Sequence, residues 1–464
     1  MRLDLPLMAG LLAARMRVRG RDRWSRARLL AFQQSELARL WRHAQARSPY
    51  YRELLGGRAD VRLADVPILT KKTLMKDWDR VCTAPGLRLT DVERRLRDVE
   101  QSAGDPGRAW RHRWWLAATG GTTGRRAAFA WDRREWTHVL ASYARVNDWA
   151  GVAVGTRQPL RTAIVSSLVP THQSAVVGAS LRSSLVPTLR LDARSQIEAL
   201  AAELNAFDPR LLVAYASMVG PLAQAQLDGV LRVRPEKVVA ASEVLGAEAR
   251  AATRRAWGDV IVDTYAATET AGIASTCPRG SWHLYEDFVI VEPVDEAGRA
   301  VPAGVTSDRV LVTVLFSRTL PLIRYELTDS IRLASGRCPC GLPFALLDAV
   351  EGRTEDVLTL PGVHGPVRIH PSVFHAALET VAPSGWQVEQ LSDRLVVRLV
   401  EPAGDPNQVR VRILDALAAL GAEPTALVVV PVASLERTRL GKNPQIKALG
   451  SSPAVGEARS AGAP

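Results

Sequence analysis

The stretch Ala118-Thr-Gly-Gly-Thr-Thr-Gly-Arg125 decides how this sequence is interpreted. Glycine permits backbone conformations that aim amide groups at one point, and threonine adds hydroxyl groups, so such a loop can surround an anion. It is not a Walker loop, because the pattern Gly-x4-Gly-Lys-Ser/Thr is absent. We expect a phosphate-binding loop here, with an ordinary glycine-rich turn as the alternative. The expected loop residues are Thr119, Gly120, Gly121, Thr122, Thr123 and Gly124.

The segments around this loop predict an α/β fold. Apolar residues recur at helical spacing in the first 60 residues. Beyond Arg111, short apolar runs alternate with helical stretches, which predicts a largely parallel sheet covered by helices. These runs are Thr162–Ser166, Leu211–Tyr215, Lys237–Ala241 and Val260–Asp263. Closely spaced strands then predict a smaller antiparallel part, at Phe288–Glu292, Arg309–Thr313 and Asp329–Leu333.

A smaller α+β unit is expected after Gly362. Its elements are a helix at Val373–Val381, a strand at Arg394–Leu399, a helix at Asn407–Leu420 and a strand at Ala426–Val430. We therefore expect an N-terminal domain over residues 1–354 and a C-terminal domain over residues 355–450. Residues 451–464 are rich in Ala, Gly, Ser and Pro and are expected to be disordered.

The composition excludes several classes of protein. The 464 residues carry a net charge of +12, and 54 of the 60 basic residues are arginine. Acidic residues alternate with these arginines and no nucleic-acid-binding motif is present, so we expect no nucleic acid partner. No apolar run is long enough to cross a membrane, and we expect no membrane partner. Four cysteines are too few for a disulfide scaffold and no secretory signal is visible, which favours a cytoplasmic protein.

Two further segments carry candidate ligand contacts. Asp263-Thr-Tyr-Ala-Ala-Thr-Glu-Thr270 follows an expected strand, and open α/β sheets place ligands at strand ends. Tyr265 can stack on a base and Glu269 can bind Mg²⁺, although, taken alone, the first is better explained as a core residue and the second as a helix-start carboxylate. Further on, Asp329 can accept two ribose hydroxyls and Arg353 can reach a phosphate with two nitrogens.

In this order, the motifs resemble those of the adenylate-forming superfamily of acyl-CoA synthetases, peptide-synthetase adenylation domains and luciferases. The likeness is greatest to its phenylacetate–CoA ligase and CapK-like branch. It extends from Trp41–Tyr51 and Pro67–Lys71 to Lys442, and ordered motifs over about 400 residues are a specific signal. The resemblance implies a large N-terminal adenylation domain, with parallel helix-covered sheets and a smaller antiparallel part. It also implies a small, mobile α+β C-terminal lid.

The resemblance further implies a role for each matching residue. Thr268 and Glu269 fall at the phosphate and magnesium positions of the family, and Lys442 falls at the position of the lysine that moves over the reacting carboxylate. Glu355 falls at the hinge, and Arg368-Ile-His-Pro-Ser372 resembles the stretch that opens the first helix of the lid. The implied nucleotide contacts are the loop Thr119–Gly124, Ser242, Glu243, Tyr265, Asp329 and Arg353.

The chain departs from the family pattern at several of these positions. Ser242 and Ala266 each stand where glycine is common, and Glu355 stands where aspartate is usual. The loop continues into Arg125-Arg126 in place of Pro-Lys, and arginine can still neutralise a phosphate.

A substrate pocket is expected beside these motifs. Its candidate residues are His172, which follows an expected strand, together with Ala266 and Ala267. A surface position for His172 is the alternative. Tyr143 and Trp149, on the helix after the loop, are expected to be core residues because aromatic residues at helical spacing usually are.

The implied activity is that of an AMP-forming ligase. A carboxylate, aromatic in this branch, would attack the α-phosphate of ATP, release pyrophosphate and form an acyl-adenylate. Mg²⁺ would assist, and a thiol such as CoA would then take the acyl group. The alternative is a CoA-independent enzyme that acylates an amine, a hydroxyl or a carrier protein in natural-product biosynthesis. Members of the branch are often dimers, so a homodimer is compatible with the resemblance.

Three of the four cysteines gather near one histidine in the sequence. Cys277, His283, Cys338 and Cys340 supply a Cys3His set in two expected turns, which favours a structural Zn²⁺. Some relatives in this branch carry a similar cluster. Free thiols beside a surface histidine, or a redox disulfide, are the alternatives. Cys82 is expected to be a packed, small apolar side chain.

Overall fold

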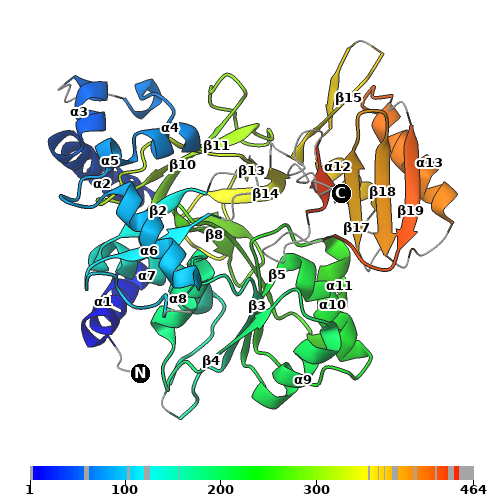
Figure 1. Cartoon of the computed structure of the whole chain (residues 1–464), viewed down its shortest axis with the longest axis horizontal. Coiled ribbons are helices and arrows are strands. Elements are labelled where there is room, and N and C mark those ends of the chain that lie inside the picture. Colours follow the sequence, from blue (N-terminus) through cyan, green and yellow to red (C-terminus); the bar gives the residue numbers. More distant parts are fainter. Residues whose placement is uncertain are drawn as a thin grey trace, which may run out of the picture.

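A nine-stranded sheet runs through the larger part of the chain in the computed structural model (Figure 1). Its strands follow the order β13-β14-β9-β8-β7-β6-β5-β3-β4. The parallel half consists of β3 (Thr162–Ser166), β4 (Thr188–Asp192), β5 (Leu211–Tyr215), β6 (Lys237–Ala241) and β7 (Ile261–Ala267). The antiparallel half consists of β8 (Ala271–Thr276), β9 (Trp282–Leu284), β13 (Asp329–Ala334) and β14 (Leu346–Arg353).

The structure describes most of the chain but not all of it. The described residues are 4–56, 62–101, 105–119, 126–155, 157–353, 356–363, 365–369, 371–378, 385–400, 402, 405–423, 426–436 and 444–448. Within these ranges we find no helix with the length and apolar character that crossing a membrane requires. The predicted disordered tail at residues 451–464 lies outside them.

Strand β7 joins the two halves of the sheet. It pairs in parallel with β6 on one side and antiparallel with β8 on the other. The predicted runs at Thr162–Ser166, Leu211–Tyr215 and Lys237–Ala241 coincide with β3, β5 and β6, so the predicted parallel sheet is confirmed. The Asp263–Thr270 motif lies on β7 and on the turn that follows it, at the point where the pairing changes direction.

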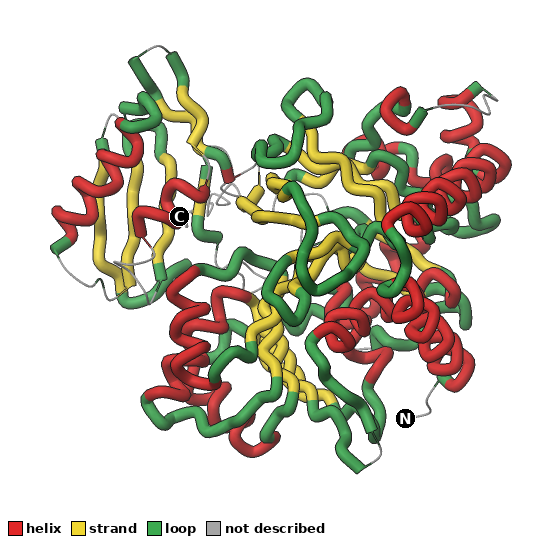
Figure 2. Tube along the Cα trace, turned by 180° about the vertical axis from the view of Figure 1, so that it is seen from behind, coloured by secondary structure: helices red, strands yellow, loops and turns green. Residues whose placement is uncertain are grey.

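Helices flank the parallel strands on both sides, as Figure 2 shows from behind. The connecting helices are α8 (Gln173–Leu181), α9 (Ile197–Phe207), α10 (Ala216–Leu227) and α11 (Ala247–Trp257). Helices α9 and α10 turn an apolar face to the sheet, and Leu200, Leu212, Leu222 and Val238 are fully or almost fully buried in one shared core. This burial on both faces explains why these strands are near-continuous apolar runs in the sequence.

Two smaller sheets complete the larger part. A hairpin of β1 (Trp115–Ala118) and β2 (Ala128–Trp131) brackets the glycine-rich stretch. An antiparallel sheet contains β10 (Val289–Val294), β11 (Arg309–Val314) and β12 (Tyr325–Leu327). The predicted antiparallel strands are thus confirmed as β10, β11 and β13, but β13 belongs to the large sheet and not to the sheet of the other two.

The predicted N-terminal helices are confirmed and form one side of the larger part (Figure 1). The first, α1, packs its buried residues Leu7, Ala14 and Val18 along α7. Helix α7 begins with a capping box in which Asp132 and Glu135 exchange hydrogen bonds with each other's backbone amides. The helices are α1 (Leu5–Arg21), α2 (Arg26–Arg47), α3 (Pro49–Leu55), α4 (Lys71–Lys76), α5 (Trp78–Val81), α6 (Leu89–Gln101) and α7 (Arg133–Trp149), with a 3-10 turn at Leu63–Asp65.

The C-terminal part has a core of its own. Phe374, Trp386, Val397 and Leu417 are buried together there, separately from the cores of the larger part. Its predicted helices and strands are confirmed in outline, whereas β15, β16, β17 and β20 were not predicted. The elements are β15 (Leu358–Leu360), β16 (Val367–Ile369), α12 (Pro371–Leu378), β17 (Trp386–Gln390), β18 (Leu395–Val400), α13 (Pro406–Ala418), β19 (Leu427–Val432) and β20 (Ile446–Lys447).

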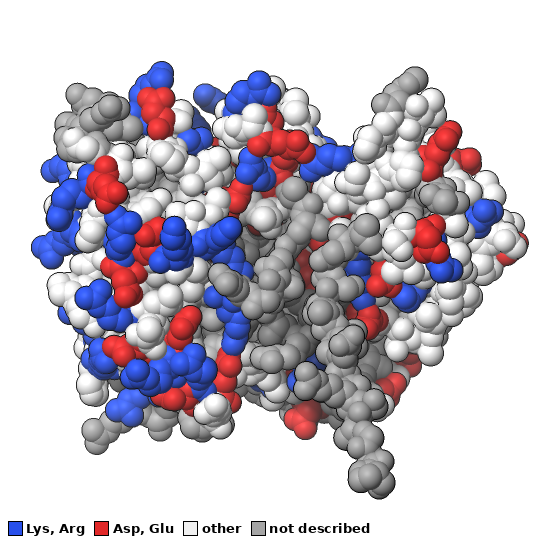
Figure 3. Space-filling model, turned by 45° about the horizontal axis from the view of Figure 1, so that its top comes forward, with Lys and Arg blue, Asp and Glu red and all other residues white. Residues whose placement is uncertain are grey.

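Basic and acidic side chains are interspersed on the surface. On the face shown in Figure 3, Lys and Arg lie among Asp and Glu over the N-terminal helices. Many arginines form ion pairs, for example Arg210 with Glu236 at 2.6 Å and Arg254 with Asp259 at 2.7 Å. Many of the 60 basic residues are therefore neutralised locally by an acidic partner.

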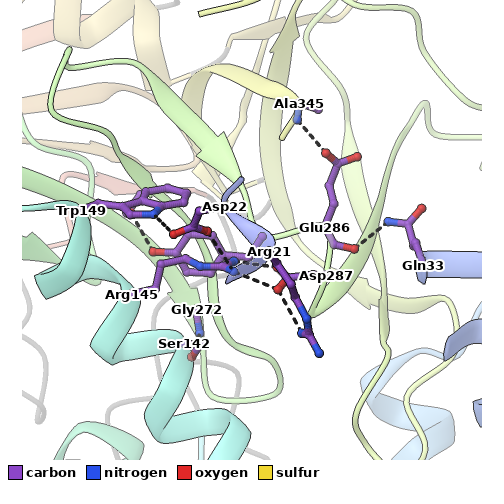
Figure 4. Close-up of polar contacts among 12 residues, drawn as sticks. Arg21, Asp22, Gln33, Ser142, Arg145, Trp149, Gly272, Glu286, Asp287 and Ala345 are labelled. Atoms are coloured by element: carbon purple, nitrogen blue, oxygen red, sulfur yellow. Dashed lines mark hydrogen bonds and ion pairs between the residues drawn. The ribbon is translucent and has the colours of Figure 1, made fainter. Parts of the chain in front are cut away.

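A buried ion pair joins the N-terminal helices to the segment between β9 and β10 (Figure 4). Arg145 on α7 contacts Asp287 at 2.6 Å, and neither side chain is exposed to solvent. Arg21 at the end of α1 adds a second contact to Asp287 at 3.1 Å. Burial opposes the charge on Asp287, but the two arginines lower the pKa of this carboxyl below its ordinary value. Its contribution to stability is therefore present at neutral pH and lost only in acid.

The substitution Asp287→Asn is expected to destabilise the fold by about 3–5 kcal/mol, because it leaves Arg145 buried without its main counter-charge. Urea unfolding followed by circular dichroism measures this change. Asp208→Asn is the matched control, since it removes an exposed partner of Arg161 and should cost less than about 1 kcal/mol. Equal effects of the two substitutions would contradict the expectation.

Candidate functional site

The predicted site residues of β7 and β13 meet although three strands separate β7 from β13 in the sheet. Tyr265, near the end of β7, donates a hydrogen bond of 2.7 Å to Asp329 at the start of β13. Tyr265 is also buried in the main core. The core position is therefore confirmed, whereas stacking on a base stays a prediction.

A second tyrosine holds Glu269, in the turn after β7. Tyr325 on β12 donates its hydroxyl to Glu269 Oε1 at 3.3 Å. Burial and the neighbouring Glu269 carboxylate raise the pKa of Tyr325 well above its ordinary value, so the phenol keeps its proton. Tyr325 was not predicted as a site residue, even though it lies inside the Leu322–Asp329 motif. Only the pairing of β12 with β11 reveals its place beside Glu269.

Gln173 supports the same turn from the opposite side. Its side-chain amide donates to the carbonyl oxygen of Thr268 at 2.9 Å and accepts from the hydroxyl of Tyr143 at 2.7 Å. Gln173 is almost completely buried and is the first residue of α8. Thr268 is thus held through its backbone, by a residue 95 positions away that sequence reasoning missed.

The two alanines of the motif lie at the partly exposed end of β7. Ala266 and Ala267 pair with Gly272 and Ala271 of β8, beyond a register shift at Tyr265. Ala266 has no left-handed backbone angle, so its replacement of glycine introduces no strain. Ser242 differs, because its φ of 69° lies in the region that favours glycine.

Glu243 contacts the start of a neighbouring helix. Its carboxylate accepts a hydrogen bond of 3.0 Å from the backbone amide of Ser217, in the first turn of α10. A negative charge is favourable at this end of a helix. The sheet therefore presents Ser242 and Glu243 just after β6, next to the motif on β7.

The base of the glycine-rich loop is closed by hydrogen bonds. Thr119 donates its amide to Ala127 at 2.9 Å and accepts the Ala127 amide on its hydroxyl at 3.0 Å. Arg126 pairs with Glu100 at 2.6 Å and donates to Thr171 at 3.0 Å. Arg126 therefore braces the loop base from within the protein. Gly120, Gly121, Thr122, Thr123, Gly124 and Arg125 lie outside the described residues.

His172 occupies the position before α8 and is half-buried. Its Nδ1 lies 3.1 Å from the hydroxyl of Ser174. It directly precedes Gln173, which contacts Thr268, so the histidine is close in sequence to the supported turn. A role in an acid pocket stays a prediction.

Strand β14 brings the backbone of Arg353 next to Asp329. Its backbone pairs with Asp329 at the last position of the β13–β14 ladder. The predicted ribose and phosphate contacts therefore come from neighbouring strand ends. The side chain of Arg353 is not among those described, and Glu355 and Lys442 lie outside the described residues.

The cysteine and histidine residues form a compact cluster at the opposite end of β13 and β14. The ligand atoms of Cys277, His283, Cys338 and Cys340 all lie within 4.8 Å of one another. Cys277 Sγ is 3.9 Å from Cys338 Sγ, and Cys340 Sγ is 3.3 Å from His283 Nε2. The remaining ring nitrogen, Nδ1, lies 3.2 Å from the carbonyl oxygen of Phe344, which orients the ring.

The burial of these residues tests the alternatives given for the cysteines. His283 is completely buried, so the surface histidine is wrong, and all four cysteines are free thiols. Cys82 is packed in the core as predicted. Burial raises the pKa of Cys82 to about 11, which makes it a poor nucleophile.

Comparisons with known proteins give a consistent result. No protein-family model matches the chain. The chain is 26% identical over 373 residues to the phenylacetate–coenzyme A ligase of Thermus thermophilus, covering 76% of each protein. Its fold is similar to that of 2-hydroxyisobutyryl-CoA ligase in the postadenylation state, with an acyl-AMP bound. The TM-score is 0.71, the identity 18%, and the match covers 92% of this chain and 91% of that one.

The same ligase in the thioesterification state with CoA matches with a TM-score of 0.56 at 19% identity, again over 92% of this chain and 91% of that one.

The substitution Tyr265→Phe is expected to weaken AMP binding about tenfold, because Asp329 loses the hydroxyl that orients it. Isothermal titration calorimetry measures the affinity. Tyr50→Phe is the control, since Tyr50 packs on Tyr51 away from this site. Unchanged affinity of the Tyr265 variant would refute the role of its hydroxyl.

Proposed function

We propose that the chain belongs to the adenylate-forming superfamily, in its phenylacetate–CoA ligase-like branch, and that it is an AMP-forming ligase for a carboxylic acid. The carboxylate attacks the α-phosphate of ATP, which forms an acyl-adenylate and releases pyrophosphate. A thiol such as CoA then takes the acyl group and releases AMP. The observation that carries the proposal is that tyrosine hydroxyls hold both predicted carboxylates, Tyr265 on Asp329 and Tyr325 on Glu269, where parallel and antiparallel pairing change over at β7.

The described residues act mainly by positioning charge. Asp329 accepts the ribose hydroxyls, and the Tyr265 hydroxyl fixes its carboxylate for this contact. Glu269 offers the oxygen ligand that Mg²⁺ prefers, and this ion supplies positive charge against the phosphates when it is bound. Tyr325 keeps the Glu269 carboxylate in place by donating a hydrogen bond to it. Thr119–Gly124 surrounds the phosphates, from a base closed by Arg126.

The C-terminal part acts as a lid in this proposal. The boundary falls at Glu355, between the domains of residues 1–354 and 355–450, and Lys442 reaches the reacting carboxylate from the lid. The separate core around Phe374 and Trp386 supports this division, because the lid can turn without exposing its own interior. Arg368 on β16 binds Glu296 and, at 3.0 Å, Asp308 of the larger part.

We propose an aromatic acid as substrate and CoA as acceptor. The support is the likeness to a phenylacetate–coenzyme A ligase, together with the similarity to a CoA ligase over nearly the whole chain. His172, Ala266 and Ala267 are the proposed pocket residues. Acylation of an amine, a hydroxyl or a carrier protein is an outcome of the test below.

We also propose that Cys277, His283, Cys338 and Cys340 hold a structural Zn²⁺. Three thiols and one imidazole within 4.8 Å match the ligand set of a closed tetrahedral site. The His283 ring is already fixed by Phe344, as in metal sites with an oriented histidine. The ion would join the β8–β9 turn to the connection between β13 and β14.

Pyrophosphate release from ATP, measured with a panel of aryl and alkyl acids, tests the activity. We expect release with at least one aryl acid, and formation of its thioester when CoA is added. Lys442→Ala is expected to abolish release while ATP binding persists, because the lysine acts on the reacting groups. Lys447→Ala is the control, since this lysine of the lid pairs with Glu436.

Each arm of this assay has a contrary result. Absence of release with every acid would refute the ligase activity. Release that needs no CoA and yields no thioester would point to a different acceptor. Full turnover by the Lys442→Ala protein would remove that lysine from the mechanism.

Zinc analysis of the purified protein is expected to find about one ion per chain, in keeping with a single closed site. Cys340→Ser should lower this content several-fold, because one of four ligands is lost. Cys82→Ser should leave the content unchanged, since Cys82 is packed in the core far from the cluster in sequence. Mass spectrometry with inductively coupled plasma measures the metal, and a content near zero in the unmodified protein would disprove the site.

A further inference from the structure

The ladder between β13 and β14 contains two irregularities. Six residues of β13 face eight residues of β14. The register shifts between Ser330 and Ile331 and again between Arg332 and Leu333. Each shift leaves one residue of β14 without a partner in the ladder, and these residues are Glu351 and Asp348. The hairpin therefore carries two bulges, and both extra residues are acidic.

The bulges decide which residue faces Asp329. At the closed end of the hairpin, Ala334 pairs with Leu346. A regular ladder continued from that pair would place Glu351 opposite Asp329. With the two bulges, Arg353 stands there instead. The irregular register thus replaces an acid–acid pair by an acid–arginine pair at the proposed nucleotide contact. In the regular ladder, two like charges would face each other there and destabilise the hairpin.

One side chain connects both bulges. Arg332 lies on β13 between the two register shifts. Its Nε donates to Asp348 at 2.6 Å, and its Nη1 donates to Glu351 at 2.7 Å. A planar guanidinium can hold two carboxylates at fixed positions, which an ammonium group cannot do as well. Both extra residues of β14 are therefore bound to the same residue of the facing strand.

Beyond Leu347, β13 is the strand that pairs with β14 among the described residues, and α12 also packs against β14. Among the residues that the structure describes, β9 pairs with β14 only at Leu346 and Leu347. Strand β13, in contrast, is also fixed on its other edge, because Ile331 exchanges hydrogen bonds of 2.9 and 3.1 Å with Ser307. If the register slips, β14 is therefore the strand that moves.

We propose that Arg332 is a positioning residue that holds the bulged register and so delivers Arg353 to Asp329. The proposal rests on the proposed function, in which this pair contacts the nucleotide. Release of Arg332 lets β14 relax to the regular ladder, in which Gly352 and Arg353 slip by two residues, and Ala349 and Val350 by one residue, relative to β13. At about 3.4 Å per residue, the end of β14 then moves by about 7 Å. This end leads toward the C-terminal part (Figure 1).

The test compares ATP affinity among variants of the full-length protein. Arg332→Met is expected to weaken ATP binding at least tenfold, as measured by isothermal titration calorimetry. In the slipped register, position 351 faces Asp329. The double variant Arg332→Met with Glu351→Arg should therefore recover ATP affinity to within about threefold of the unmodified protein, since an arginine again faces Asp329. Arg299→Met is the control, because its ion pair with Asp295 is exposed and local.

The double variant separates positioning from general stability. A merely structural Arg332 would leave the double variant as weak as Arg332→Met, and that result would overturn the proposal. Affinity of Arg332→Met within twofold of the unmodified protein would also overturn it. If circular dichroism shows both variants unfolded, Arg332 is required for folding and the positioning role is wrong. If the unmodified protein releases no pyrophosphate with any acid but the variants still show these differences in ATP affinity, the ligase activity is refuted and the positioning role of Arg332 stands.

Discussion

The buried ion pair between Arg145 and Asp287 is the constraint on which the arrangement of the larger part depends. Both charges are fully removed from water, and such a pair is tolerated only when its geometry is fixed by further contacts. Here Arg21 and Asp22 from the end of α1 supply those contacts, so helix α1 must dock for the pair to be satisfied. The rings of Trp149, Tyr285, Phe288 and Phe344 surround the guanidinium and exclude water.

This pair also reaches both functional regions. Asp287 lies between β9 and β10, and its neighbour Glu286 accepts the backbone amide of Ala345, just before β14 (Figure 4). Trp149 contacts the ring of His283 in the cysteine–histidine cluster. On the same face of α7, about one turn before Arg145, Ser142 accepts the amide of Gly272 on β8, next to the β7 motif. One helix therefore connects the cysteine–histidine cluster and the strand pair that carries the proposed active-site residues.

Much of the fold could be predicted because its signals are local. The strands β3, β5 and β6 are buried on both faces, so apolar side chains form unbroken runs that mark the strands to the residue. The motif residues Glu269 and Asp329 could also be predicted from a local signal, because their neighbours in sequence form the recognisable motifs. Strand β17 was missed, since Trp386–Gln390 alternates polar and apolar residues over only five positions.

The supporting residues could not be predicted, because their partners are distant in sequence. Gln173 and Tyr325 resemble ordinary polar and core residues until the chain folds and places them beside Thr268 and Glu269. The two bulges in β14 have no composition signal, and only the pairing shows that Glu351 is passed over in favour of Arg353. Arg126 was expected at a phosphate, yet Glu100 binds it, 26 positions away.

The cysteine–histidine cluster has a consequence for the order of folding. Cys277 and Cys338 are 61 positions apart, so their sulfurs come together only after the long intervening segment has formed its own strands. Closing such a segment costs chain entropy before any ligand can share an ion, and contacts between distant residues form late and slowly. Metal capture would then be a final step that marks a correctly assembled sheet, and a chain with an unformed β13–β14 connection would expose three reactive thiols.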